Sequence, residues 1–102
     1  MNKKIKVNDP TSNINGTSLI GYVKTTYANL VEQLGESETG WDKSTAHWTI
    51  ESSDGTVATI YDWKTSDVPT GEYHWHIGGH YKQKSNALLL VGIVTNAIPE
   101  VA

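Results

Sequence analysis

The 102-residue sequence contains no cysteine, no phenylalanine and no arginine. Without cysteine the chain forms no disulfide and offers no thiolate to a metal ion or a substrate. Without arginine its eight basic residues are all lysines, and its eleven acidic residues leave a net charge of −3. A broad basic face for duplex nucleic acid is therefore not expected.

Long apolar runs are also missing from the sequence. No stretch approaches the roughly 20 apolar residues of a membrane span, and no apolar segment follows the first lysines as in a signal peptide. We therefore expect a soluble, cytoplasmic protein without a membrane partner. What the chain does have is four tryptophans and five tyrosines, which bury large surfaces while keeping a polar edge.

One domain with a single hydrophobic core is expected at this length. Residues 1–16 are polar and predict a loose N-terminal arm with room for a short strand at residues 5–7, so that residues 17–102 form the domain. Residues 18–24 are rich in strand formers. Residues 25–35 predict an amphipathic helix that Thr25 or Thr26 caps and Gly35 ends.

The middle of the chain predicts a β-hairpin and a third strand. Residues 46–52 and 56–64 form the hairpin around Asp54 and Gly55, because Asp-Gly favours turns with positive φ. The third strand covers residues 73–77, and Gly78 and Gly79 are expected to end it.

The last element is predicted to be a very apolar helix from about residue 85 to residue 98, ended by Pro99. A helix that is apolar on all sides requires burial on more than one side. We therefore expect one side to pack on the sheet and the other to form a homo-oligomer, through Leu88, Leu89, Val91 and Ile93. The fold class is α+β, with an antiparallel sheet of three or four strands, one short helix and this apolar C-terminal helix.

Three of the four histidines lie within residues 73–85, "YHWHIGGHYKQKS", and allow a metal site. His74 and His76 are two residues apart on a strand, so they point to one side and could grip zinc together with His80 or His47. No carboxylate is placed to orient these rings. We therefore expect partly buried histidines, no metal and no cofactor.

The same histidines allow a second interpretation, catalysis on a phosphodiester. Two imidazoles on one strand face can serve as general acid and general base, with Lys82 or Lys84 to offset charge. The sequence lacks a cysteine nucleophile, a Gly-x-Ser-x-Gly motif and a carboxylate cluster for magnesium. An enzyme is therefore not the leading expectation.

A third interpretation is an anion-binding corner between the third strand and the last helix. Glycine lets backbone approach a phosphate closely, and the free amides at the start of a helix bind one. Nearby aromatic side chains would supply stacking surfaces for a base. The expected ligand-binding residues are Tyr61, Trp63, Tyr73, Trp75, His76, Gly78, Gly79, His80, Lys82, Lys84 and Ser85.

Three segments of the chain resemble a family of small bacteriophage proteins. They are the helix of residues 27–35, the block of residues 48–64 that reads Trp-x-Ile-x-x-x-Asp-Gly-x-Val-x-Thr-Ile-Tyr-Asp-Trp-Lys, and the Trp-His-Ile-Gly-Gly of residues 75–79. The resemblance spans residues 17–95. By class it is similar to phage sponges that sequester the cyclic-nucleotide signals of CBASS or Thoeris immunity, which implies a ligand-binding oligomer in the infected host cytoplasm.

Three functions therefore remain as hypotheses. The first is a counter-defence protein that holds a small nucleotide without chemistry. The second is a phage inhibitor that binds a host defence or nucleic-acid enzyme directly. The third is a small phosphodiesterase that uses the histidines.

Overall fold

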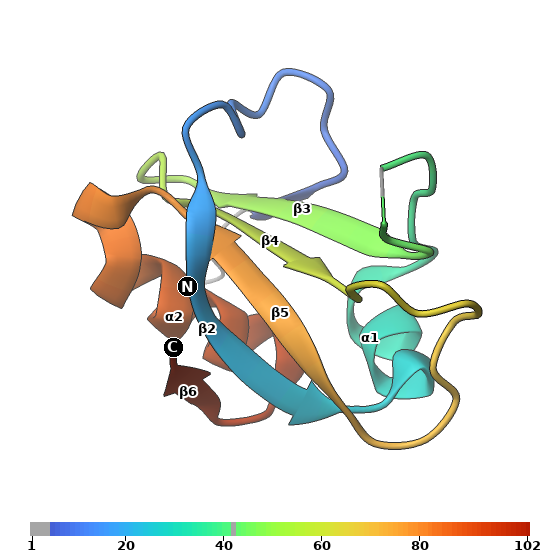
Figure 1. Cartoon of the computed structure of the whole chain (residues 1–102). Helices are drawn as coiled ribbons and strands as arrows, with labels where there is room; N and C mark the ends of the chain where they lie inside the picture. Colours follow the sequence, from blue (N-terminus) through green and yellow to red (C-terminus); the bar gives the residue numbers. More distant parts are fainter. Residues whose placement is uncertain (1–4, 42) are drawn as a thin grey trace.

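The computed structural model describes residues 5–41 and 43–102. They form an α+β fold in which one antiparallel sheet is backed by two helices (Figure 1). The elements in chain order are β1 (Ile5–Val7), β2 (Ser18–Thr25), α1 (Tyr27–Leu34), β3 (His47–Ser52), β4 (Val57–Tyr61), β5 (Tyr73–Gly79), the 3₁₀ turn η1 (Tyr81–Gln83), α2 (Lys84–Thr95) and β6 (Pro99–Val101).

The sheet has six strands in the order β1-β3-β4-β5-β2-β6, all antiparallel to their neighbours. The predicted hairpin is confirmed as β3 and β4, which pair from His47 opposite Tyr61 to Glu51 opposite Val57. Gly55 in its turn has φ of 86°, a conformation that glycine adopts without steric cost. β4 ends at Tyr61, so residues 62–64, which the sequence placed in this strand, lie beyond its end.

The predicted first helix is confirmed with both of its ends. Thr26 caps α1, because its side-chain oxygen accepts from the Asn29 N–H at 3.1 Å, and Gly35 follows its last residue with φ of 86°. Both α1 and α2 lie behind the sheet in Figure 1 and contact each other. No helix in residues 5–41 and 43–102 is long and apolar enough to cross a membrane.

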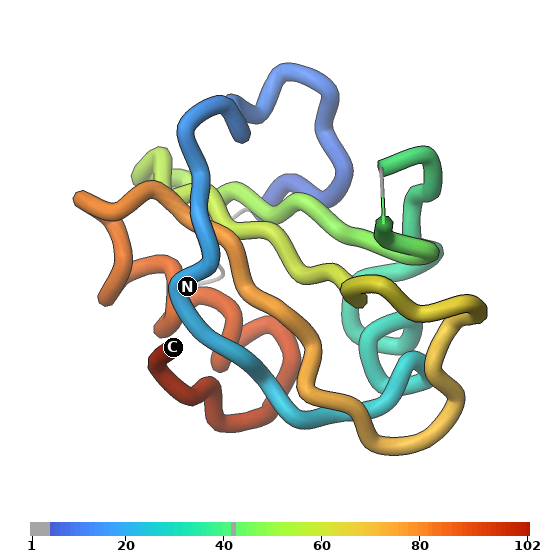
Figure 2. The backbone as a smooth tube through the Cα atoms, viewed as in Figure 1, coloured from blue at the N-terminus to red at the C-terminus, as the bar shows by residue number. Residues whose placement is uncertain are grey.

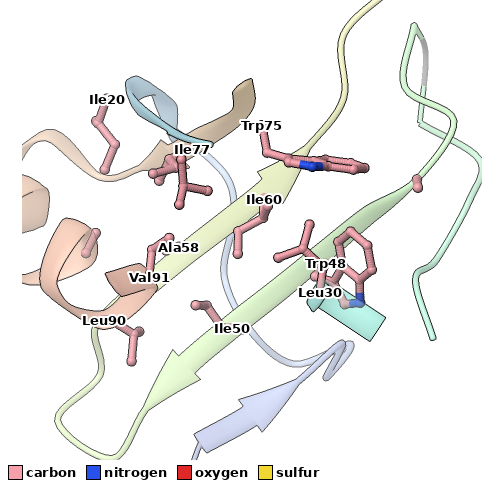
Figure 3. Close-up of a cluster of buried hydrophobic side chains, with 13 residues drawn as sticks. Ile20, Leu30, Trp48, Ile50, Ala58, Ile60, Trp75, Ile77, Leu90 and Val91 are labelled. Atoms are coloured by element: carbon pink, nitrogen blue, oxygen red, sulfur yellow. The ribbon is translucent and has the colours of Figure 1, made fainter. Parts of the chain in front are cut away.

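Two tryptophans form the centre of the core between the sheet and the helices (Figure 3). Trp48 on β3 and Trp75 on β5 meet edge to face, with ring centroids 5.6 Å apart. Each indole N–H has a backbone acceptor: Trp48 donates to Gly35 at 3.0 Å and Trp75 to Thr25 at 3.2 Å. Both acceptors flank α1, so the two indoles tie this helix to the sheet.

The predicted strand number was too low. The three to four expected strands are six. The short strand allowed for at residues 5–7 is present as β1, and β6, an edge strand of three residues, was not predicted. Such short segments carry too few positions for an alternating pattern. Pro99, which was expected only to stop the helix, is also the first residue of β6, a place where a strand tolerates proline.

The expectation that Gly78 and Gly79 end the third strand was wrong. Both lie inside β5, and Gly78 pairs with Leu19 on one side and Thr59 on the other. A side chain at Gly78 would clash with the Thr59 hydroxyl, and one at Gly79 would clash with Ile20. These glycines are therefore required by close packing within the sheet, not by a turn.

The helix α2 begins and ends slightly earlier than predicted and is not the last element. It runs from Lys84 to Thr95, and Asn96 ends it in the left-handed conformation with φ of 55°. Val91, expected in an oligomer contact, is fully buried in the core of its own chain. Gly92 faces Pro99, whose Cδ would lie 3.1 Å from an added Cβ, so contact with the β6 segment explains the glycine.

We expect Gly21→Ala to detach β6, since the new methyl group would clash with the backbone carbonyl of Glu100. The free energy of unfolding should fall by about 1–3 kcal/mol. Hydrogen exchange should show loss of protection at the Ala102 amide, which donates to the Ile20 carbonyl. Gly71→Ala is the matched control, because no atom lies within 4 Å of its added Cβ; equal effects of the two changes would contradict this prediction.

Candidate functional site

A row of four ring side chains crosses the face of the sheet that the helices leave free. Strand pairing places His47 opposite Tyr61, Tyr61 opposite His76, and His76 opposite Tyr22. Because side chains alternate along a strand, this row lies on the opposite face from Trp48 and the rest of the core. The His76 ring centroid is 5.4 Å from that of Tyr61 and 5.1 Å from that of Tyr22.

Two tryptophans from loops flank this ring row. Trp41 stacks on His47 with ring centroids 3.6 Å apart and planes 9° apart. Trp63, which directly follows β4 and Asp62, lies 6.2 Å from Tyr61 and 6.4 Å from His76. The rings therefore form one continuous aromatic surface.

A pocket of about 220 Å³ lies beside this surface. Its floor includes Thr59 and Gly78, where the missing side chain keeps the space open. The lining residues are Ile14, Thr17, Ser18, Trp41, Ser44, Thr59, Tyr61, Trp63 and Gly78. The pocket is therefore lined by three tryptophan and tyrosine rings together with threonine and serine hydroxyls.

The N-terminal arm supplies one wall of the pocket. After β1 the chain must reach β2, four places along the sheet, and Figure 2 follows its blue tube arcing past the end of the sheet into β2. Asn8 pairs with Thr49, Ser12 donates to Glu51 at 2.7 Å, and the His80 Nε2 lies 2.9 Å from the Asn13 carbonyl oxygen. These bonds fasten the arm and place Ile14 and Thr17 against the pocket.

The fully buried carboxylate of Asp62 fixes the two loops that carry the tryptophans. Its oxygens accept five hydrogen bonds, from the hydroxyls of Ser44, Thr45 and Thr65 and from the backbone N–H groups of Thr45 and Ala46. Burial, the largest influence, raises the pKa of Asp62, but the hydrogen bonds together outweigh it and hold the pKa below its ordinary value. Asp62 is therefore ionised at neutral pH.

Burial lowers the pKa of both histidines in the ring row. Desolvation is the main cause at His47 and at His76; Glu38 and Asp62 oppose it at the first ring and Asp62 at the second. The Nδ1 atom of each ring is buried and has no hydrogen-bond partner in the described part of the chain. At neutral pH the two rings are uncharged and contribute flat aromatic surface.

Two lysines stand next to the loop tryptophans. Lys43 and Lys64 both have positive φ, 63° and 56°, and the Lys64 N–H donates to the Lys43 carbonyl at 2.7 Å. Both side chains are exposed. The Lys64 Nζ lies 6.0 Å from the centre of the Trp63 ring, so positive charge adjoins the aromatic surface.

The structure gathers four of the predicted ligand-binding residues at this site. Tyr61, Trp63 and Gly78 line the pocket, and His76 lies beside Tyr61 in the ring row. Tyr73 supports the site from behind, since its hydroxyl accepts from the Trp63 N–H at 3.1 Å.

The other predicted residues lie elsewhere. Trp75 is buried in the core, Gly79 packs against Ile20 and Ala87, and His80 holds the arm. Lys82 lies in η1, and Lys84 and Ser85 begin α2; none of the three lines the pocket. Both glycines are buried in β5, and Gly79 packs near the start of α2 through Ala87. The anion-binding corner expected there stays a prediction.

Sequence reasoning missed Trp41, Thr59 and the arm residues of the pocket. The signal for Trp41 was its occurrence in the otherwise polar connector of residues 36–45, where a large ring has no core to enter. The residues described also contain no group of three or more histidine and acidic side chains that could hold a metal ion.

What the site offers is stacking surfaces and hydroxyl groups.

The chain matches no protein-family model, no curated protein and no solved structure. The site is therefore interpreted from its own geometry and chemistry.

We expect Asp62→Asn to loosen both tryptophan loops. In the unaltered protein both carboxylate oxygens accept hydrogen bonds, whereas the asparagine NH₂ group would point its own hydrogens at some of these donors. The free energy of unfolding at pH 7 should fall by about 2–3 kcal/mol, and Asp67→Asn, at an exposed position, should have almost no effect. A carboxyl with a lowered pKa stabilises the fold above its unfolded value of 3.8 and loses this effect as pH falls through the folded value. The gap between wild type and variant should therefore close in acid; a gap independent of pH would contradict the prediction.

A second pH dependence is expected from the two histidines of the ring row, His47, which is buried, and His76, which is half-buried. Their folded pKa values lie below the ordinary 6.5, so the unfolded chain binds more protons and stability falls as pH drops from about 7 to about 5. Replacing one ring by His76→Phe should reduce this slope, measured by urea unfolding at each pH. The slope above about pH 7.5, where neutral histidine does not titrate, serves as the internal control; an unchanged slope below it would contradict the assignment.

Proposed function

We propose that the protein binds a small nucleotide in the aromatic pocket and holds it without altering it. The observation that carries this proposal is the pairing of two loop tryptophans, Trp41 and Trp63, around a pocket with Tyr61 in its wall. Every nucleobase has a flat π-face, and stacking on an aromatic side chain contributes about 1–3 kcal/mol per base. The Thr59 hydroxyl supplies a partner for base edges. The hydroxyls of Thr17 and Ser44, which donate to Ile14 and Asp62, can still accept a hydrogen bond.

The size of the pocket indicates which part of a nucleotide would enter it. At about 220 Å³ it is smaller than the roughly 300–1,000 Å³ typical of sites that enclose a drug-sized molecule. It suits one base, with ribose and phosphates remaining at the mouth. The Lys64 Nζ lies 6.0 Å from the centre of the Trp63 ring, and the Lys43 carbonyl accepts from the Lys64 N–H. These two exposed lysines would pair with phosphate oxygens.

The protonation states support binding without chemistry. A general base needs a free lone pair near a reacting group and a pKa near the working pH. The oxygens of Asp62 accept hydrogen bonds from five donors. The two row histidines lie among other rings, and the pKa of each histidine is below its ordinary value. A nucleotide would find stacking surfaces, while the Asp62 carboxylate is held by its five donors and the Nδ1 atoms of both histidines are buried.

The resemblance to small phage proteins supports a biological role for such binding. A protein that removes a defence signal needs affinity and no turnover. We therefore propose a counter-defence sponge in the cytoplasm of an infected bacterium, with a cyclic oligonucleotide or an ADP-ribose-type signal as ligand. A second base or phosphate beyond the pocket would engage the exposed part of Trp63 and the lysines, which favours such signals over mononucleotides.

Isothermal titration with cyclic dinucleotides, cyclic trinucleotides, cyclic ADP-ribose and AMP tests the proposal. We expect one of the cyclic ligands to bind more tightly than AMP, and Trp41→Ala or Trp63→Ala to weaken that binding about 5- to 150-fold. Tyr81→Ala is the control, because this ring is exposed on η1 and lines no part of the pocket. Lys43→Ala and Lys64→Ala should weaken binding less and reduce its dependence on salt.

The fate of the ligand separates the three hypotheses. Recovery of the intact ligand from heat-denatured protein supports a sponge, whereas conversion of the ligand would establish a phosphodiesterase. No heat with any of these compounds, using folded protein, would refute nucleotide binding and favour direct inhibition of a host protein.

A further inference from the structure

A second, larger hollow lies on the helix side of the sheet, between α2 and β6. This groove encloses about 460 Å³ and is almost entirely apolar. Its lining residues are Ser85, Leu88, Leu89, Gly92, Ile93, Pro99 and Val101. Because α2 covers the face opposite the ring row, the groove is separate from the aromatic pocket.

The α2 side of this groove rises into a ridge of exposed aliphatic side chains, Leu89 and Ile93. Leu89 is 65% exposed and Ile93, one turn further, is 69% exposed, while Ile98 beyond the helix is 89% exposed. Single exposed apolar residues are common on protein surfaces, but a contiguous patch marks an interaction site. Ridge and groove therefore lie side by side on one small surface.

The lack of charge in the groove and ridge favours a partner whose contact surface is also uncharged. No charged side chain lines the groove, although the chain as a whole carries a net charge of −3. Two copies of an acidic protein repel each other over most of their surfaces. At this patch they meet without like charges and without leaving a buried charge unpaired.

The adjoining sheet edge is poorly suited to adding a strand. The Ala102 N–H donates to the Ile20 carbonyl of β2, so the backbone groups of Glu100, two residues earlier, also face β2. Those of Pro99 and Val101 face outward, and proline has no N–H to donate. Proline at an edge blunts strand addition, so a partner here docks on side chains.

We propose that two copies of this chain form a dimer through α2, related by a two-fold axis. With the two helices antiparallel, the Leu89 and Ile93 ridge of each copy enters the groove of the other, and Leu89 lies against Ile93 of the second copy. Such an isologous contact needs a surface that complements itself, which a ridge beside a groove provides. Stable dimers of modest size bury about 600–800 Å² per copy, of the order of a tenth of the 6099 Å² surface of this chain.

Sedimentation equilibrium at micromolar concentration tests the proposal with the full chain. We expect a mass of twice 11.2 kDa for the unaltered protein. Leu89→Glu and Ile93→Lys, each alone, should shift the protein to monomer, with unchanged circular dichroism because both positions are exposed. Asn86→Glu is the matched control: it is exposed on the same helix, lies outside the groove and should leave the dimer intact.

Mixing the two charged variants tests the orientation of the helices. In the antiparallel arrangement the introduced carboxylate of Leu89→Glu faces the introduced ammonium of Ile93→Lys, so the mixture should recover a mixed dimer that neither variant forms alone. A monomer at every concentration, or a dimer that persists in both single variants, would overturn the proposal. Nucleotide titration of the monomeric variants keeps this result distinct from the proposed function, because the aromatic pocket is intact in them.

Discussion

The candidate site depends on one buried carboxylate. Asp62 follows directly on β4 and accepts from five donors in residues 44–46 and 65, so its carboxylate joins two loops without regular structure. Trp41 and Trp63 flank the bonded segments. The aromatic surface is therefore held in place by a group that does not itself line the pocket.

The sheet separates two kinds of surface. Its helix side is filled by Trp48, Trp75 and aliphatic residues, and continues outward through α2 into the apolar patch. Its other side carries rings, hydroxyls and the arm. A ligand site and a proposed contact between copies can therefore coexist on 102 residues without competing for the same side chains.

The sequence predicted those features that depend only on residues close together in the chain. The Thr26 cap, the Gly35 stop and the Asp-Gly hairpin each involve a few adjacent residues, and the structure confirms all three. The pocket combines residues from the arm, two loops and two strands, so only the fold brings Ile14, Trp41 and Gly78 together. Gly78 and Gly79 were misread as a turn, because the side chains that pack closely on them, Thr59 and Ile20, come from strands distant in sequence.

The strand order has a consequence for how the chain folds. β2 is made early, but its two neighbours are β5 and β6, and Ser18 pairs with Gly79. Contacts between residues so far apart in sequence close large loops and slow folding. During synthesis β1 can pair with β3, whereas β2 must wait for most of the chain to emerge. The aromatic pocket, which includes Ser18 of β2 and Gly78 of β5, is therefore completed only when these two strands pair.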